Sequence, residues 1–277
     1  MTSINSHIQI PRFILKQFEN EKGLLDFYDF TDKPKCGFAN VERIKPGQSK
    51  HLNTEKDFFS ENTERFLNEN VERPFSKFLN KAKGILDGNT VTLDCHDKET
   101  VIRYFNALLA RGTECQKDVG EDLYSSIFIQ ETTPAANTSS AAKTFLHDMC
   151  AIFGITSVKN KIVGDNPCVS LGINTTNIPF VLPNIGFCLC KNTIIAPVTP
   201  KLAVIIALEE KERFLREDGL YCAKFETEET VKNLNCRLFI SEAANRRYVT
   251  ATSKEQLAEI VAEMHRDGLL PENESAV

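Results

Sequence analysis

The sequence predicts an α+β fold in which a mainly helical shell surrounds a small, largely antiparallel sheet. Several long segments repeat apolar residues every three or four positions, which is the spacing of a buried helix face. Residues 155–208 instead carry β-branched runs that are broken by Gly, Asn and Pro, a pattern typical of strands. We therefore expect more helix than strand, and a sheet built from residues 24–30 and 155–208.

Two short elements are expected near the start of the sequence. Residues 10–18 begin with a proline suited to a first helical turn, and they place Ile14 and Phe18 one turn apart. Residues 24–30, LLDFYDF, are apolar and aromatic enough to predict a strand.

Two further helical segments are expected, one around Leu67 to Ala82 and one over residues 97–117. Pro74 lies inside the first and predicts a kink, or a break into two helices, near Arg73. Asp97 is the expected cap of the second. The two buried faces are defined by Leu67, Val71, Phe75, Phe78 and Ala82, and by Val101, Phe105, Leu108 and Leu109.

The C-terminal part predicts two more helices. Thr227 begins the first, and Ser253-Lys-Glu-Gln256 is a capping box that opens the second. We expect a single globular domain over residues 1–266, a frayed tail over 267–277, and an exposed loop at 132–140. The inward residues of the two helices are Val231, Leu234 and Leu238, followed by Leu257, Ile260, Val261 and Met264.

Composition sets the partner classes. The net charge of -5 is neither strongly basic nor strongly acidic, so it indicates no class of partner. Any contact with nucleic acid therefore needs a local basic patch. No run of about 18 apolar residues exists, which predicts no membrane partner. The nine cysteines are scattered without a C-x-x-C pair, and the start does not resemble a signal peptide. We expect a soluble cytoplasmic protein with reduced thiols and no structural zinc; the oligomeric state is left open.

The run IVGDNPCV contains the first candidate site residues, Asp165 and Asn166. Asn before Pro is held in an extended turn, and Asp165 either caps that turn or stands at a strand end beside a cleft. Arg111 follows an apolar helix face, where a buried guanidinium needs a counter-charge. Its partner is either Asp165 or Glu114, three residues further on.

The second candidate cluster is HIQIPRFILKQF at the start of the sequence. Arg12 and Lys16 share one helix face and repel each other unless an anion lies between them. Either Asp165 or a phosphate-bearing ligand supplies that anion, or the two cations are only solvated. His7 precedes the pair, and its near-neutral pKa makes it the natural acid or base.

A metal site is the weaker alternative. Asp165 followed by Glu209 and Lys211 loosely fits a nuclease pattern in which carboxylates hold Mg²⁺ and a lysine orients water. The reading that we prefer needs no cofactor. The sequence contains no P-loop, dinucleotide, zincin or α/β-hydrolase motif.

The ordered set HIQIPRFILKQF, LLDFYDF, RFLNENVERPFSKFL, YFNALLARGTE, KIVGDNPCV and IIAPVTPKLAVIIAL resembles the domain of unknown function 4238 family over nearly the whole chain. The residues that match the family pattern are His7, Arg111, Asp165-Asn-Pro and Pro197 to Pro200. Pro11 also matches, but it stands one position later than the pattern expects. Gly164 replaces an expected Ser, which excludes a serine nucleophile in that loop, and Val198-Thr199 replaces Leu-Ser. The resemblance implies one domain and supplies no activity.

Two functions follow as hypotheses. The first is a nuclease-like hydrolase that acts on nucleic acid or another phosphate-bearing substrate. His7, Arg111 and Asp165 are its catalytic residues, and Arg12, Lys16 and Asn166 bind the substrate. The second is a non-catalytic binding module, in which the same residues form an anion pocket or a structural ion-pair network.

Overall fold

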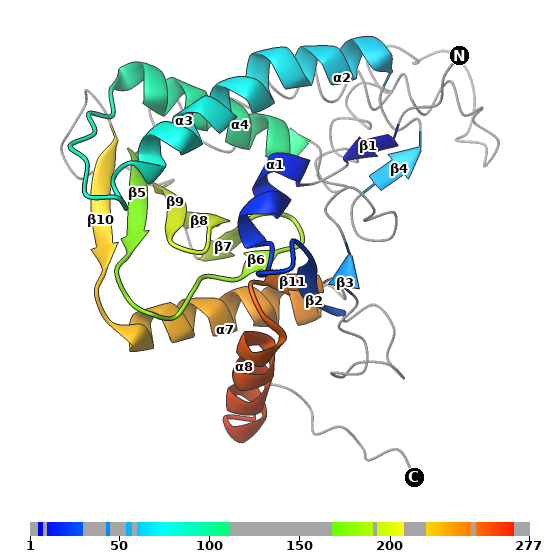
Figure 1. The fold of residues 1–277 in the computed structure, drawn as a ribbon, viewed down its shortest axis with the longest axis vertical. Coiled ribbons are helices and arrows are strands. Elements are labelled where there is room, and N and C mark those ends of the chain that lie inside the picture. The colour runs from blue at the N-terminus through cyan, green and yellow to red at the C-terminus, as the bar shows by residue number, and fades with distance from the viewer. Residues whose placement is uncertain are drawn as a thin grey trace, which may run out of the picture. The chain divides into compact units, whose positions relative to one another are not determined.

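The structure is a computed structural model, and Figure 1 labels its helices and strands. Helix makes up 49% of the residues it describes and the sheets are antiparallel or mixed, so the α+β class and the excess of helix are confirmed. The described residues are 5–7, 10–29, 43–44, 54–56, 60–110, 168–190, 193–207, 220–244 and 248–268.

The contacts within the chain define two compact units, and each is described by itself. The first comprises residues 1–11, 53–169 and 207–220, and the second comprises residues 12–52, 170–206 and 221–277. The single domain expected over residues 1–266 stays a prediction. The loop at 132–140 and the tail from residue 269 onward lie outside the described residues.

The first unit is a helical layer with a small two-stranded sheet. Strand β1 (Asn5–His7) pairs antiparallel with β4 (Thr54–Lys56). Helix α2 (Glu61–Leu67), the π-helical turn η4 (Asn68–Glu72) and helix α3 (Arg73–Lys83) form one rod, against which α4 (Cys95–Ala110) packs (Figure 1).

The predicted buried faces of this helical layer are confirmed except at Leu109, whose side chain lies outside the described part of the structure. All five apolar positions between Leu67 and Ala82 are at most 2% exposed, and Val101, Phe105 and Leu108 of α4 are also buried. The ring of Phe75 stacks on Tyr104 with centroids 3.8 Å apart and meets Phe105 edge-on. Aromatic packing therefore joins α3 to α4.

The predicted interruption at Pro74 is also present, as a π-helical turn. The Arg73 N–H donates to the carbonyl of Asn68, five residues back, just before the proline. Proline has no N–H to bond to the carbonyl of Asn70, and its ring clashes with that carbonyl. The wider turn thus falls where an α-helical turn is least stable.

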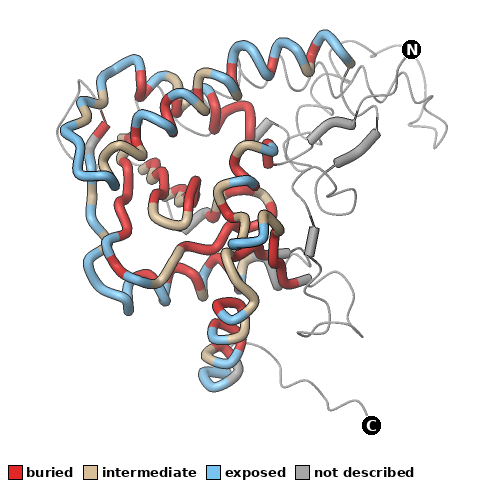
Figure 2. The backbone as a smooth tube through the Cα atoms, viewed as in Figure 1, coloured by how far each residue is buried: buried red, intermediate tan, exposed pale blue. Residues whose placement is uncertain are grey.

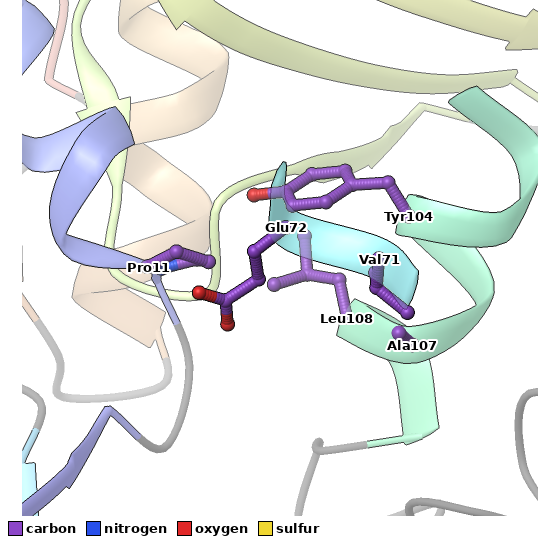
Figure 3. Close-up of a pocket in the computed structure, with 6 residues that line it drawn as sticks. All are labelled: Pro11, Val71, Glu72, Tyr104, Ala107 and Leu108. Carbon is purple, nitrogen blue, oxygen red and sulfur yellow. The ribbon is translucent and has the colours of Figure 1, made fainter. Parts of the chain in front are cut away.

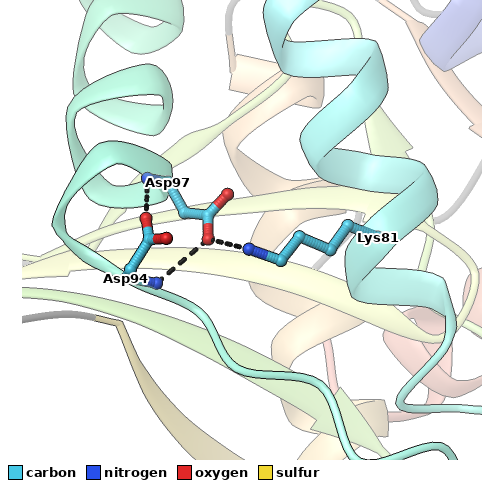
Figure 4. Close-up of polar contacts among 3 residues, drawn as sticks. All are labelled: Lys81, Asp94 and Asp97. Carbon is cyan, nitrogen blue, oxygen red and sulfur yellow. Dashed lines mark hydrogen bonds and ion pairs between the residues drawn. The ribbon is translucent and has the colours of Figure 1, made fainter.

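The cap of α4 differs from the prediction. The helix begins at Cys95, and the Asp94 carboxylate accepts the Asp97 N–H at 3.0 Å. The Asp97 carboxylate in turn accepts the Asp94 N–H at 3.0 Å (Figure 4). Asp97 is therefore the third helical residue of a reciprocal capping box whose N-cap is Asp94.

The second unit contains two sheets. In the five-stranded sheet the strand order is β10-β5-β9-β8-β7, with β10 parallel to β5 and β7 antiparallel to β8. Its strands are β5 (Cys168–Asn174), β7 (Cys188–Cys190), β8 (Thr193–Thr199), β9 (Leu202–Ala207) and β10 (Tyr221–Phe225). The antiparallel four-stranded sheet has the order β3-β2-β11-β6, built from β2 (Leu25–Asp29), β3 (Arg43–Ile44), β6 (Leu182–Pro183) and β11 (Tyr248–Ala251).

The number of sheets and five of the described strands, β1, β3, β4, β10 and β11, were not expected from sequence. The predicted strand near residues 24–30 exists as β2, but it pairs with β11, about 220 residues later, and not with the β-rich segment. Strands β10 and β11 are short and lie in regions dominated by helical patterns. Periodicity identifies an element, whereas it does not identify that element's partner in a sheet.

Helices α7 (Glu228–Ala244) and α8 (Lys254–Arg266) cover these strands. Thr227 and Ser253 cap them as predicted, accepting the N–H groups of Thr230 at 3.3 Å and Gln256 at 3.1 Å. Every predicted inward residue of both helices is buried, in one core with Phe180, Phe239 and Tyr28. In Figure 2 the strands are mostly buried, whereas the helices have one buried side and one exposed side.

Candidate functional site

The structure describes three of the predicted site residues in part. His7 lies in β1 opposite Thr54 of β4, and its side chain is outside the described part of the structure. Arg12 and Lys16 lie in α1 (Arg12–Leu15) and in the following 3₁₀ turn η1 (Lys16–Phe18). The remaining predicted residues lie outside the described ranges; they are Arg111, Glu114, Asp165, Asn166, Glu209 and Lys211.

The α1–η1 segment begins directly after Pro11, and one of its faces is apolar. Ile14, Leu15 and Phe18 are buried at 2%, 4% and 0% exposed, which fixes this face on the unit. Arg12 and Lys16 are exposed, four residues apart. Neither forms an ion pair with any other residue that the structure describes. We call these two side chains the basic pair.

The segment that carries the basic pair contacts strand β8, and a turn connects β8 to β9. The η1 turn packs against β8, which runs into Pro200 and Lys201. The Thr199 hydroxyl accepts the N–H groups of Lys201 at 3.1 Å and Leu202 at 2.8 Å, so the side chain fixes the backbone of this turn.

A buried polar network holds the neighbouring loop, residues 174–181. Asn174 donates to the carbonyl of Ile178 at 2.6 Å, and its side-chain oxygen accepts the Thr176 hydroxyl at 2.8 Å. From α7, Asn235 donates to the Pro179 carbonyl at 2.9 Å and accepts the Val181 N–H at 3.1 Å. From α8, Gln256 donates to the same Pro179 carbonyl at 2.7 Å. We call these side chains, Asn174, Thr176, Asn235 and Gln256, the loop network.

Lys201 belongs to the turn between β8 and β9, and its side chain reaches this loop. Its ammonium donates to the main-chain carbonyl of Thr176. No carboxylate among the described residues lies within ion-pair distance of it. Partial burial lowers the pKa of Lys201 below its ordinary value of 10.5, because the charged form loses hydration.

The first unit contains a shallow pocket of about 160 Å³ (Figure 3). The carboxylate of Glu72 and the hydroxyl of Tyr104 point toward the side where Pro11 lies, and apolar side chains form the rest. Pockets for small molecules usually have about 300–1,000 Å³. This pocket is therefore too small for a whole substrate. Its lining is Pro11, Val71, Glu72, Tyr104, Ala107 and Leu108.

The acidic cluster at the start of α4 has a structural role. Lys81 of α3 approaches the Asp97 carboxylate at 2.5 Å, which ties the two helices together (Figure 4). The hydrogen bond from the Asp97 N–H, helped by the positive charge of Lys81, lowers the pKa of Asp94 below 3.8 even though burial opposes this. All charges of this cluster are used in capping and pairing.

The described residues bring no three His, Cys, Asp or Glu side chains together in a way that would hold a metal ion. Asp165 and Glu209, the alternative metal ligands, are outside these ranges. Five cysteines whose side chains the structure describes are free thiols: Cys95, Cys168, Cys188, Cys222 and Cys236.

Comparisons with protein-family models, curated proteins and solved structures find nothing that matches this chain. The resemblance to the domain of unknown function 4238 family stays a prediction. None of the described helices is long and apolar enough to span a membrane.

Sequence reasoning identified the basic pair and missed Lys201 and the loop network. The three amides of the network stand among apolar residues; Asn235, for example, lies between Leu234 and Leu238 on the buried face of α7. A polar residue inside a buried stripe is a signal for a long-range hydrogen bond. The partner of that bond, 56 residues away in the chain, is visible only in the fold.

Proposed function

We propose that the protein is a nuclease-like hydrolase that binds a phosphate-bearing substrate, with nucleic acid as the preferred class. The observation that carries this proposal is the basic pair, two exposed cations one helical turn apart without an ion-pair partner among the described residues. Like charges at this spacing destabilise a helix. A phosphate that accepts hydrogen bonds from both cations removes that repulsion.

The proposed reaction is hydrolysis of a phosphodiester. A water oxygen joins phosphorus, one P–O bond breaks, and the proton lost by water ends on the departing oxygen. His7 takes up or delivers that proton, Arg111 and Asp165 complete the catalytic group, and Asn166 joins the basic pair in holding the substrate. If the reaction depends on Mg²⁺, Asp165 and Glu209 are the expected ligands, with Lys211 orienting the water.

A turnover assay tests this proposal. Purified protein is incubated with RNA, single-stranded DNA and duplex DNA, each with Mg²⁺ or with EDTA. We expect His7→Ala to reduce cleavage about 10²–10⁴-fold, with an unchanged melting temperature. Activity that survives EDTA favours His7 as acid or base, and strict Mg²⁺ dependence favours the metal alternative. Absence of cleavage by the wild type contradicts the hydrolase.

The second candidate is a non-catalytic module that binds the same phosphate-bearing ligands. It is favoured by the basic pair alone, because binding requires no acid or base. In that case the wild type binds nucleic acid without cleaving it, and Arg12→Ala weakens binding.

The free thiols in the described residues support our further proposal that the protein works in a reducing compartment such as the cytoplasm.

A further inference from the structure

We propose that Lys201 is a third cation of the phosphate site, so that the ligand is a chain of phosphates contacted by Arg12, Lys16 and Lys201. This inference rests on the proposed function and extends it to a residue outside the α1–η1 segment. It also narrows the ligand class, because three cations on two elements suit successive phosphates of a nucleic-acid strand better than one isolated phosphate.

The α1–η1 segment and Lys201 belong to the same unit, and strand β8 connects them. The η1 turn that begins with Lys16 packs against β8, and β8 leads directly into Lys201. Arg12 and Lys16 are held by the buried face of their segment, and the backbone of Lys201 is held by the Thr199 hydroxyl. Fixed backbones present their cations with little loss of freedom when a ligand binds.

The ammonium of Lys201 lies in a partly buried environment without a described counter-charge. Lys201 donates to the neutral carbonyl of Thr176 and has no carboxylate partner in the described residues. A partly buried cation without a counter-charge keeps an unfavourable hydration cost, which agrees with its lowered pKa. A phosphate supplies the missing charge, and such perturbed groups are common where ligands bind.

Hydrogen bonds to Asn174 hold Thr176, whose carbonyl accepts the Lys201 ammonium. The Thr176 hydroxyl and N–H both bond to the side-chain oxygen of Asn174, at 2.8 Å and 3.0 Å. Asn174 is only 3% exposed and is tied through Ile178 to the loop that Asn235 and Gln256 hold. The loop network therefore fixes the carbonyl that orients Lys201. Asn174, Asn235 and Gln256 are positioning residues for this cation.

Salt-dependent binding tests the proposal. The probe is a 12-nucleotide oligouridylate, titrated at several salt concentrations into wild type, Lys201→Gln and Lys201→Arg. The Gln variant keeps a donor for the Thr176 carbonyl and loses the charge, whereas Arg keeps the charge. We expect Lys201→Gln to weaken binding about tenfold and to lower the salt slope by about 0.7, the value for one phosphate of a single strand. Lys201→Arg should stay close to wild type.

Lys224→Gln is the matched control, because Lys224 is an exposed cation of the same unit on β10. If Arg12→Ala and Lys16→Ala lower the slope while Lys201→Gln behaves like Lys224→Gln, this inference is overturned and the proposed function stands. If the wild type does not bind the oligonucleotide, the proposed function itself fails.

Amine labelling of the wild type gives a second readout that does not depend on a variant folding. The protein is acylated with and without the oligonucleotide, and modified lysines are located by mass spectrometry. We expect the oligonucleotide to protect Lys201 and not Lys224. Equal protection of Lys201 by inorganic phosphate at the same phosphate concentration would contradict a phosphate chain as the ligand.

Discussion

The helical layer of the first unit and the loop network of the second are both buried, but they are stabilised by different physical interactions. Between α3 and α4 the contacts are aromatic and aliphatic, with Phe75 at the centre. Around residues 174–181 the contacts are directional hydrogen bonds from Asn174, Asn235 and Gln256. Apolar packing stabilises in proportion to buried area, whereas the network stabilises one loop conformation because every alternative leaves a buried polar group unsatisfied.

This difference predicts that the largest single loss of stability lies in the aromatic layer. Phe75→Ala removes a fully buried ring and should cost about 3–5 kcal/mol in the free energy of unfolding. Phe66→Ala is the control, because Phe66 is 39% exposed on the same helical rod and should change stability much less. Urea unfolding followed by circular dichroism measures both. Equal losses would contradict the buried-face assignment.

The loop network should show a smaller loss. Asn235→Ala leaves the Val181 N–H without its acceptor and should cost about 1–3 kcal/mol. Asn233→Ala, an exposed asparagine on the same helix, should have little effect. Hydrogen exchange at Val181 is the sharper measurement, because the loss is local. Unchanged protection there in Asn235→Ala would show that the network does not hold the loop.

The ion pair between the helices should contribute less still. Asp97→Asn weakens the contact with Lys81, whose side chain is 40% exposed, so solvent screens the ion pair. The free energy of unfolding should fall by about 1 kcal/mol, and most of this loss comes from the weakened capping box. Chemical denaturation of this variant beside Lys77→Ala, an exposed lysine of the same helix, measures the difference. A loss above about 3 kcal/mol would indicate a buried pair.

Acid should weaken the same capping box in a defined pH range. The pKa of Asp94 is lowered in the folded protein, so its ionised form stabilises the fold above the unfolded value of about 3.8. This contribution is lost as the pH falls below 3.8 through the folded pKa. Asp94→Asn should therefore flatten the dependence of the melting temperature on pH in that range. An unchanged profile would show that Asp94 does not titrate in this way.

The comparison also explains what the sequence made predictable. The faces around Phe75 and Leu238 follow from 3.6-residue periodicity, because local spacing decides which side of a helix is apolar. The pairing of β2 with β11 and the bond from Asn235 to Pro179 join positions far apart in the chain, and no local spacing encodes them. Within the candidate site, exposure of Arg12 and Lys16 was predictable from their place opposite Ile14, whereas Lys201 was not, because its environment is made by the fold.

A salt titration of the double variant Arg12→Ala/Lys16→Ala tests most directly whether the basic pair binds phosphate. Affinity for a 12-nucleotide oligouridylate is measured between 50 mM and 200 mM salt, with the melting temperature recorded in parallel. Both side chains are exposed, so stability should change by less than about 0.5 kcal/mol for each. The salt slope should fall by about 1.4, two single-strand phosphate contacts. A double variant with wild-type affinity and slope would contradict the account.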